Sequence, residues 1–215
     1  MGEKKTLILI DANALIHRAY HALPPLSTKK GEIVNAVYGF ASVFLKILRE
    51  FKPDYVLAAF DLPAPTFRHL EYKEYKAHRP KTPEDLSAQF SRVKEVLAVF
   101  GVPVLEKAGF EADDVIGTVA EKIKKEKSPV QTVIVTGDLD TLQLVGENTK
   151  VCALKKGVSE TVIYDEKAVA ERFGLKPERL VDFKGLKGDP SDNIPGVKGI
   201  GEKTASVLIQ KFGNL

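Results

Sequence analysis

Short apolar runs rich in β-branched residues alternate along the chain with longer segments in which apolar residues recur at helical spacing. The runs predict strands at Thr6–Ile10, Tyr55–Phe60, Pro103–Leu105 and Thr132–Val135, with an edge strand at Thr161–Ile163. The helical segments are Ile33–Arg49, Leu86–Phe100 and Ala112–Ile123. Strands that alternate with helices pair in parallel and are covered on both faces. The sequence therefore predicts an α/β fold with a mostly parallel central sheet flanked by helices.

The C-terminal part has a different pattern. From about Lys176 onward there is no convincing strand, only short helical pieces punctuated by Gly and Pro. We therefore expect a core over residues 1–170 and a small helical subdomain over residues 171–215. The chain stops soon after the last helical segment, so we expect this subdomain to be truncated.

Composition narrows the class of protein. The chain is 44% hydrophobic and 28% charged, which is typical of a globular protein. No apolar run approaches the roughly 20 residues that span a bilayer. A single cysteine, Cys152, permits no disulfide within the chain, and we expect a cytoplasmic location. The net charge of +3 allows nucleic-acid binding without requiring it.

Aspartates follow three of the predicted strands. LILI runs into Asp11, VLAAF into Asp61, and TVIVTG into Asp138, with Asp140 two residues later. Ligands of an open α/β sheet bind beyond the carboxyl ends of its strands, so these side chains are expected to point to one region. The segment FEADD adds more acids just before a predicted helix. These acids are Glu111, Asp113 and Asp114.

Crowded carboxylates raise one another's pKa unless cations neutralise them. Oxygen ligands without His or Cys partners select Mg²⁺ or Mn²⁺. Two such ions ~3.5–4 Å apart clamp a phosphodiester and activate a water for in-line attack. The pattern therefore favours metal-assisted phosphoryl hydrolysis.

Each acid also has a plainer interpretation. An Asp after a strand is often only a helix N-cap, which alone explains Asp11 or Asp61. Asp138 and Asp140 could cap the turn at Thr141–Val145. Acids in the first turn of the Ala112 helix could interact favourably with the positive end of its dipole. Taken together, these interpretations require several coincidences at one sheet edge, so we favour the shared site.

Five segments, in this order, resemble one family: LILIDANALIHRAYHAL, AAFDLPAPTFRHLEYKEYKAHRP, GFEADDVIGTVA, GDLDTLQL and GDPSDNIPGVKGIGEKTA. They are similar to the 5′-nuclease domain of bacterial DNA polymerase I and its free-standing relatives, the flap endonuclease superfamily. The resemblance runs from about Thr6 to the last residue. It implies a PIN-like core and a 5′-3′ exonuclease and flap endonuclease of DNA replication and repair.

The resemblance assigns roles by position. It implies a first metal site, together with a bridge toward the second site, at Asp11, Asp61, Glu111, Asp113 and Asp114. It implies that the second metal site is formed by Asp138, Asp140, Asp189 and Asp192. It implies that Arg18, Lys76, Arg79 and Lys184 contact the scissile phosphate or the threaded strand. The catalytic set that it implies is Asp11, Asp61, Lys76, Arg79, Glu111, Asp113 and Asp138. The implied cofactors are two Mg²⁺ or Mn²⁺ ions.

The basic segment at about residues 64–82 corresponds to an arch over the active site in that family. Here Lys76 and Arg79 would neutralise charge on the phosphoryl oxygens, and Tyr75 offers a face for stacking on unpaired bases. The plainer interpretation is a solvated amphipathic helix. The adjoining Asp61 motif makes us favour the arch.

The tail motif GVKGIGEKTASVLI resembles a helix-hairpin-helix. Its glycines, Gly196, Gly199 and Gly201, would let the backbone approach a DNA phosphate, with Lys198 and Lys203 beside them. The resemblance adds a K⁺ ion at the hairpin, a 5′ flap or 5′ end at a DNA junction as substrate, a polymerase domain, fused or separate, as partner, and a nucleoid-associated location. We expect a monomer.

Three alternatives stay open. IVTGDLDTL also fits the signature of haloacid-dehalogenase phosphatases, with Asp138 as nucleophile and Asp140 as acid. However, only about fifty residues separate it from GDPSDN, and Asp11, Asp61 and Glu111 would have no role. The second alternative is a DNA-binding module without catalysis, and the third is a structure-specific RNase, since nothing here reads a 2′-hydroxyl.

Overall fold

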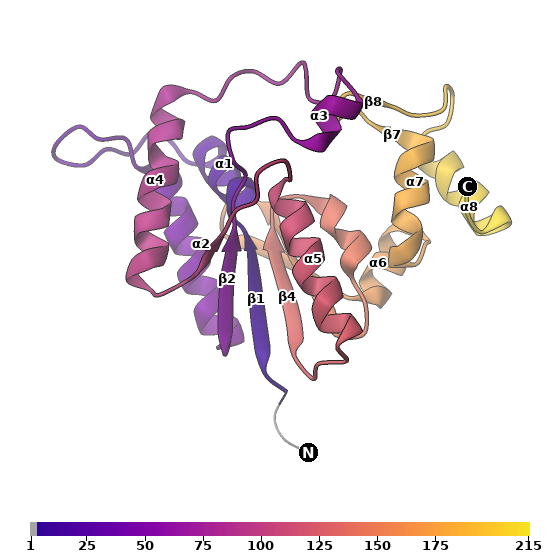
Figure 1. The fold of residues 1–215 in the computed structure, drawn as a ribbon, viewed down its shortest axis with the longest axis horizontal. Coiled ribbons are helices and arrows are strands. Elements are labelled where there is room, and N and C mark those ends of the chain that lie inside the picture. The colour runs from indigo at the N-terminus through magenta and orange to yellow at the C-terminus, as the bar shows by residue number, and fades with distance from the viewer. Residues whose placement is uncertain (1–3) are drawn as a thin grey trace.

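The computed structural model describes residues 4–215, and its centre is a six-stranded sheet in the order β3-β2-β1-β4-β5-β6 (Figure 1). The first five strands are parallel, and β6 runs antiparallel to β5 at one edge. Between β1 and β4 the chain reverses its direction of travel across the sheet, which is where open α/β sheets bind ligands. The strands are β1 (Thr6–Asp11), β2 (Tyr55–Ala59), β3 (Val104–Leu105), β4 (Gln131–Thr136), β5 (Thr149–Lys156) and β6 (Glu160–Tyr164).

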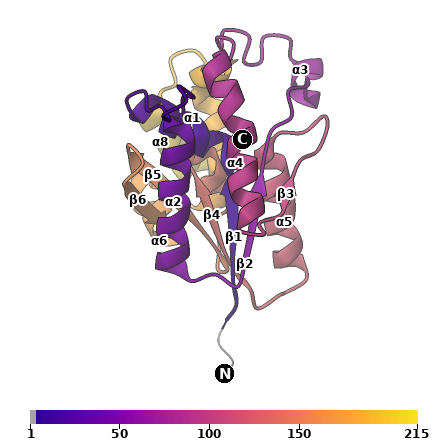
Figure 2. The same ribbon diagram turned by 90° about the vertical axis from the view of Figure 1, so that its left-hand side faces the viewer.

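Alternation along β1 explains why helices cover both faces. Ile8 and Ile10 pack into one core with α1 (Ala12–Ala22), α2 (Asn35–Phe51) and α4 (Glu84–Val99). Leu7 and Leu9 pack into a second core with α5 (Ala112–Lys125) and α6 (Glu166–Phe173). Figure 2 looks onto α2 and α4 in front of the sheet. Because side chains in a strand alternate between faces, one central strand contributes to both cores.

A strap of chain passes over the carboxyl-terminal edge of the sheet. It joins β2 to α4 and contains one short helix, α3 (Phe67–Glu71), at the opposite end of the sheet from the N-terminus (Figure 1). Residues 73–78 are turns, so the solvated amphipathic helix that was the plainer interpretation of this segment forms only as the five residues of α3.

The C-terminal subdomain packs its helices against the second core. Its elements are η2 (Pro177–Arg179), α7 (Leu180–Lys187), β7 (Gly188–Asp189), η3 (Pro190–Asp192), β8 (Ile194–Pro195) and α8 (Glu202–Phe212), and a further 3-10 helix, η1 (Leu139–Leu144), follows β4. Phe183 of α7 and Ile209 of α8 are buried there. The expectation of no strand after Lys176 is wrong in detail, because β7 and β8 form a two-residue antiparallel pair.

The five predicted strands and three predicted helices are present, but β5 was not predicted. Its sequence TKVCALKK begins and ends in polar residues, and only its middle is buried on both faces. The boundary expected at residues 170/171 falls inside α6, which ends at Gly174 in the left-handed conformation. Among the described residues, no helix is long and apolar enough to cross a membrane.

Candidate active site

Asp11 lies at the end of the central strand and is almost fully buried. One carboxyl oxygen accepts from the Ala14 backbone N–H at 3.0 Å, and the other accepts from the Thr136 hydroxyl at 2.6 Å. The capping role that a lone Asp suggests is therefore real for Asp11. It does not exclude a second role, since the same carboxyl faces the acids described next.

Two further acids come from α5 and the end of β2. Asp61 Oδ1 accepts from the Ala112 N–H at 2.6 Å, so it caps the helix that carries Asp113. Asn13 accepts from the Asp61 N–H at 3.1 Å and fixes the chain at that point. Asp61 and Asp113 are thereby brought beside Asp11 and Asp138, although they lie far apart in the sequence.

The electrostatics confirm that these carboxyls form one cluster. Burial, together with the charges of Asp11, Asp138 and Asp61, raises the pKa of Asp113 to about 8. Burial raises the pKa of Asp11 to about 6, against the opposing hydrogen bonds from Thr136 and Ala14. No hydrogen bond within residues 4–215 reaches the Asp113 carboxyl, and the nearby charge of Lys76 only partly offsets its raised pKa. A proton or a bound cation would relieve the repulsion.

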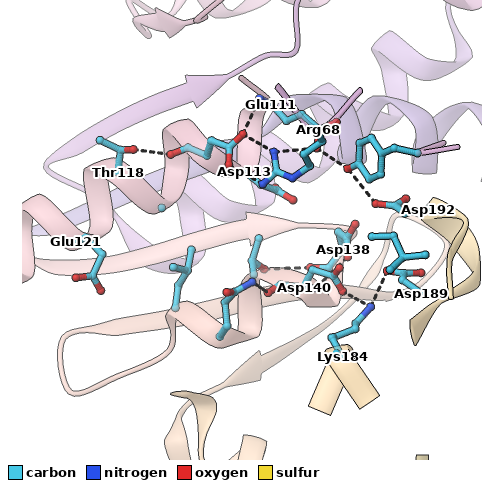
Figure 3. Close-up of a pocket in the computed structure, with 18 of the residues that line it drawn as sticks. Arg68, Glu111, Asp113, Thr118, Glu121, Asp138, Asp140, Lys184, Asp189 and Asp192 are labelled. Carbon is cyan, nitrogen blue, oxygen red and sulfur yellow. Dashed lines mark hydrogen bonds and ion pairs between the residues drawn. The ribbon is translucent and has the colours of Figure 1, made fainter. Parts of the chain in front are cut away.

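A second group of acids surrounds Lys184. Its ammonium lies 2.7 Å from Asp140 and 2.8 Å from Asp189, and Figure 3 shows it between them. Burial lowers the pKa of Lys184, but the two carboxylates outweigh it and hold that pKa well above its usual value. Burial also raises the pKa of Asp140, and the neighbouring charge of Asp138 raises it further. Asp138 therefore borders both groups.

Asp114 is placed differently from the other predicted metal ligands. Arg68 donates to both of its oxygens, at 2.7 and 2.8 Å, and the Glu111 N–H donates to Oδ2 at 2.9 Å. Burial raises its pKa, but the hydrogen bonds from Arg68 outweigh it, and the net pKa is lowered. In this arrangement Asp114 anchors α3 to α5, and its role as a metal ligand stays a prediction.

The strap supplies three polar side chains to the acids beneath it. Tyr75 is buried and donates its hydroxyl to Glu111 at 2.9 Å and to Asp192 at 3.2 Å. The Lys76 ammonium lies 2.8 Å from Glu111, and Arg79 forms an ion pair with Asp192. The strap therefore places hydrogen-bond donors and positive charges beside the carboxylates of Glu111 and Asp192.

Two cavities open on either side of the strap. The larger, of about 990 Å³, extends between α5 and α7, with Thr118 and Glu121 along its length (Figure 3). The smaller, of about 450 Å³, lies toward α1 and is lined by His17 and His21. Both are lined by Lys76, Glu111, Asp113 and Asp138, so the acids lie where two openings meet.

The donor set fits hard divalent cations. The cluster offers carboxylate oxygens without sulfur or imidazole, and the Asp113 carboxyl has no hydrogen-bond partner among the described residues. Within residues 4–215, however, no three acidic, His or Cys side chains converge closely enough to form a ready-made ligand set. The fit is therefore one of chemistry and placement.

The remaining predicted DNA-binding residues lie in two places. Arg18 lies 3.4 Å from the carbonyls of Gly137 and Leu154, at the edge of the sheet that carries Asp138. Lys198 and Lys203 are exposed at the tail loop and the start of α8.

The tail glycines differ among themselves. Gly199 has a φ of 84° and open space around it, and Gly201 also has open space where a Cβ would lie. The role of Gly196 in approach to DNA stays a prediction, but the structure gives this glycine a packing role as well. A Cβ there would meet the Lys187 carbonyl carbon at 2.3 Å, so this glycine is required by contact with α7.

Four residues that shape the site were not singled out from the sequence: Asn13, Arg68 as the partner of Asp114, Thr136 and Asn193. Thr136 immediately precedes the Gly137-Asp138 pair, so its place beside Asp11 follows from the β1–β4 register. The partners of Asn193 and Arg68 are 119 and 46 residues away, and no local pattern signals such contacts.

A parallel sheet that gathers carboxylates at its carboxyl-terminal edge, beneath a basic strap and beside a small helical subdomain, defines the class of the 5′ nucleases. The family model described as "5′-3′ exonuclease, N-terminal resolvase-like domain" matches residues 6–174, and "5′-3′ exonuclease, C-terminal SAM fold" matches residues 175–215. The chain belongs to the 5′-3′ exonuclease family.

The chain is also similar in sequence to curated DNA polymerases. DNA polymerase I of Bacillus subtilis is 45% identical over 215 residues, which cover all of this chain and 24% of the relative. DNA polymerase I of Mycobacterium tuberculosis is 46% identical over 214 residues, which cover 99% of this chain and 24% of the relative. The chain therefore spans about a quarter of the length of these polymerases.

Solved structures share the fold. The T5 D15 protein co-crystallised with metal ions superposes with a TM-score of 0.78 at 21% identity, covering 98% of this chain and 76% of that one. Flap endonuclease-1 of Methanococcus jannaschii gives a TM-score of 0.59 at 22% identity, covering 97% and 71%. The predicted fold is confirmed.

Proposed function

We propose that this chain is a divalent-metal-dependent 5′ nuclease domain that hydrolyses DNA phosphodiester bonds near single-strand/double-strand junctions, as a 5′-3′ exonuclease and flap endonuclease. One observation carries the proposal. Asp11, Asp61, Asp113 and Asp138 come from four separate segments and line one pocket beneath a cationic strap, where the charges of Asp61 and Asp138 help to raise the pKa of Asp11 and of Asp113. A folded protein tolerates such repulsion where cations and phosphate are to be bound.

The acids fall into two sets for two Mg²⁺ or Mn²⁺ ions. Bound ions would supply Lewis acidity and an activated water for in-line attack on the phosphodiester. The first set is Asp11, Asp61, Glu111, Asp113 and Asp114, and the second is Asp138, Asp140, Asp189 and Asp192. A K⁺ ion at the tail hairpin belongs to the same proposal.

The basic side chains act on the DNA itself. Lys76 and Arg79 lie over the acids, where they would contact the phosphoryl oxygens and neutralise charge that develops on them. Arg18 and Lys184 would hold the flanking phosphates. Tyr75 is buried against Glu111, so its expected stacking on an unpaired base requires the strap to open.

The two cavities suggest how the substrate lies. A single strand that enters under the strap from one opening and leaves by the other would pass the acid cluster, while the duplex rests on the tail hairpin. The DNA backbone is the feature read, so binding would be non-specific in sequence and sensitive to salt. A cytoplasmic, nucleoid-associated monomer, fused to or working with a polymerase domain, is the setting we propose.

The phosphatase alternative leaves Asp11, Asp61 and Glu111 without a role, although all three share a pocket with Asp138. A catalytically silent module would have no need of the costly carboxyl cluster.

The test is cleavage of a labelled 5′-flap duplex. In Mg²⁺ we expect cuts near the junction that vanish in EDTA and fall by orders of magnitude in Asp138→Asn. Hydrolysis of small phosphomonoesters without flap cleavage would support the phosphatase instead. A matched flap with ribonucleotides at the junction distinguishes a DNase from an RNase.

A further inference from the structure

The strap is tied to the loop that follows α7. Asn193 donates its side-chain amide to the Glu74 carbonyl at 2.8 Å, and the Tyr72 hydroxyl donates to the Asn193 carbonyl at 3.3 Å. The Lys76 N–H donates to the Asp192 carbonyl at 2.9 Å. These three bonds connect the turn at residues 72–76 to the loop at residues 192–193, and we call them the arch latch.

Few apolar contacts hold the strap in place. From Leu70 to Asp85 only Tyr75 is buried, and the helix that begins the strap is five residues long. Such a segment cannot be fixed by apolar packing, so its position depends on polar contacts. Those contacts lie at Asp192, Asn193 and Glu111.

The backbone conformations of Lys76 and Asn193 also indicate that polar contacts hold the strap in place. Lys76 has a φ of 54° and Asn193 a φ of 59°, both in the left-handed region. Asn adopts this region readily, whereas a Lys there is strained and persists only where its surroundings hold it. Lys76 is held at both ends, by its N–H on Asp192 and by its ammonium on Glu111.

We infer that Asn193 is a positioning residue that holds the arch, and with it Lys76 and Arg79, over the carboxylates. Asn193 contacts the strap at Glu74 and Tyr72, and within residues 4–215 its side chain makes no hydrogen bond to an acidic side chain. It acts by fixing the turn that places the two cations. This inference deepens the proposed nuclease function and rests on it for its catalytic consequence.

The test uses Asn193→Gly, which adopts the left-handed backbone without strain and removes the side-chain amide, although it also frees the backbone. We expect hydrogen exchange of the amides at residues 72–79 to speed up several-fold, with faster tryptic cleavage after Lys73 and Lys76. On the flap substrate we expect kcat to fall about 3- to 10-fold, the effect of losing one net hydrogen bond, with KM nearly unchanged.

Two companion variants isolate the latch. Tyr72→Phe removes the second bond without touching Asn193, and we expect the same pattern at smaller amplitude. Asn148→Gly is the matched control. The Asn148 side chain accepts from the Gln131 side-chain amide at 2.8 Å, at the amino-terminal ends of β4 and β5 and so at the opposite edge of the sheet from the strap. It should leave exchange at residues 72–79 and kcat unaltered.

The outcomes separate the two proposals. The latch would be overturned if hydrogen exchange at residues 72–79 were the same in Asn193→Gly and in the unaltered chain. A rise in KM without a fall in kcat would also overturn it. If the unaltered chain cleaves no flap, the nuclease proposal fails, but the exchange comparison still decides whether Asn193 holds the arch.

Discussion

At the scale of single residues, the half-buried carboxyl of Asp113 couples the stability of the fold to pH. Its pKa of about 8 lies above that of an Asp in an unfolded chain, so the folded state binds the proton more tightly. Stability from this proton is fully present below pH ~4 and is lost as pH rises toward 8. Asp11, with a pKa of about 6, adds to the loss over the lower part of that range.

We therefore expect Asp113→Asn to stabilise the metal-free protein at pH 8 and to have little effect at pH 4. A gain of ~1–2 kcal/mol corresponds to a Tm rise of about 2–8 °C for a chain of this size. Thermal unfolding in EDTA at both pH values measures it. Equal Tm differences at pH 4 and pH 8 would contradict the carboxyl cluster.

A second residue-scale prediction concerns Thr132 in β4. Its side-chain oxygen is buried without a hydrogen-bond partner among the described residues, which costs ~1–3 kcal/mol. Thr132→Val keeps the shape and removes that oxygen, so we expect urea unfolding to show a stability gain of about 1 kcal/mol. Thr136→Val is the opposing control, because the Thr136 hydroxyl bonds Asp11 and its loss should destabilise the fold.

At the scale of elements, α2 begins without a capping side chain of its own. Gln89 of α4 supplies the cap, since its carbonyl accepts from the N–H groups of Ala36 at 2.8 Å and Val37 at 3.2 Å. Its amide group donates to Asn35 at 3.2 Å in the same buried network. The start of one helix therefore depends on the middle of another.

Gln89→Leu should destabilise the protein by about 2–4 kcal/mol, because it leaves buried amides unpaired. Chemical denaturation measures the loss. Gln210→Leu is the matched control: Gln210 donates to the Gly174 carbonyl from an exposed position and should cost under about 0.5 kcal/mol. A Gln89 variant as stable as this control would exclude the capping role.

The elements also show where sequence reasoning succeeds. Asp11, Asp61 and Asp138 were predicted to meet because parallel strands present their carboxyl ends at one edge, and the structure places them so. β5 escaped prediction because its ends are polar, and Gln89 because its partners lie more than 50 residues away. Contacts set by tertiary packing, such as Arg68 with Asp114, carry no local signal.

At the scale of the whole molecule, the excess positive charge is small but unevenly placed. Lys198 and Lys203 are exposed on the tail hairpin, away from the acid cluster. A Lys198→Ala/Lys203→Ala double variant should bind a DNA duplex more weakly and show a salt slope flatter by about 2, with kcat at saturation preserved. Fluorescence anisotropy across salt concentrations measures both quantities. An unchanged slope would refute the hairpin assignment.

The strand order has a consequence for synthesis. β1 pairs with β2 some 48 residues on and with β4 some 125 residues on, and Lys184 and Asp189 come later still. A nascent chain that emerges from the ribosome N-terminus first therefore holds Asp11 and Asp61 long before Asp138 reaches them. A chain abandoned midway through translation would therefore lack the complete acid cluster.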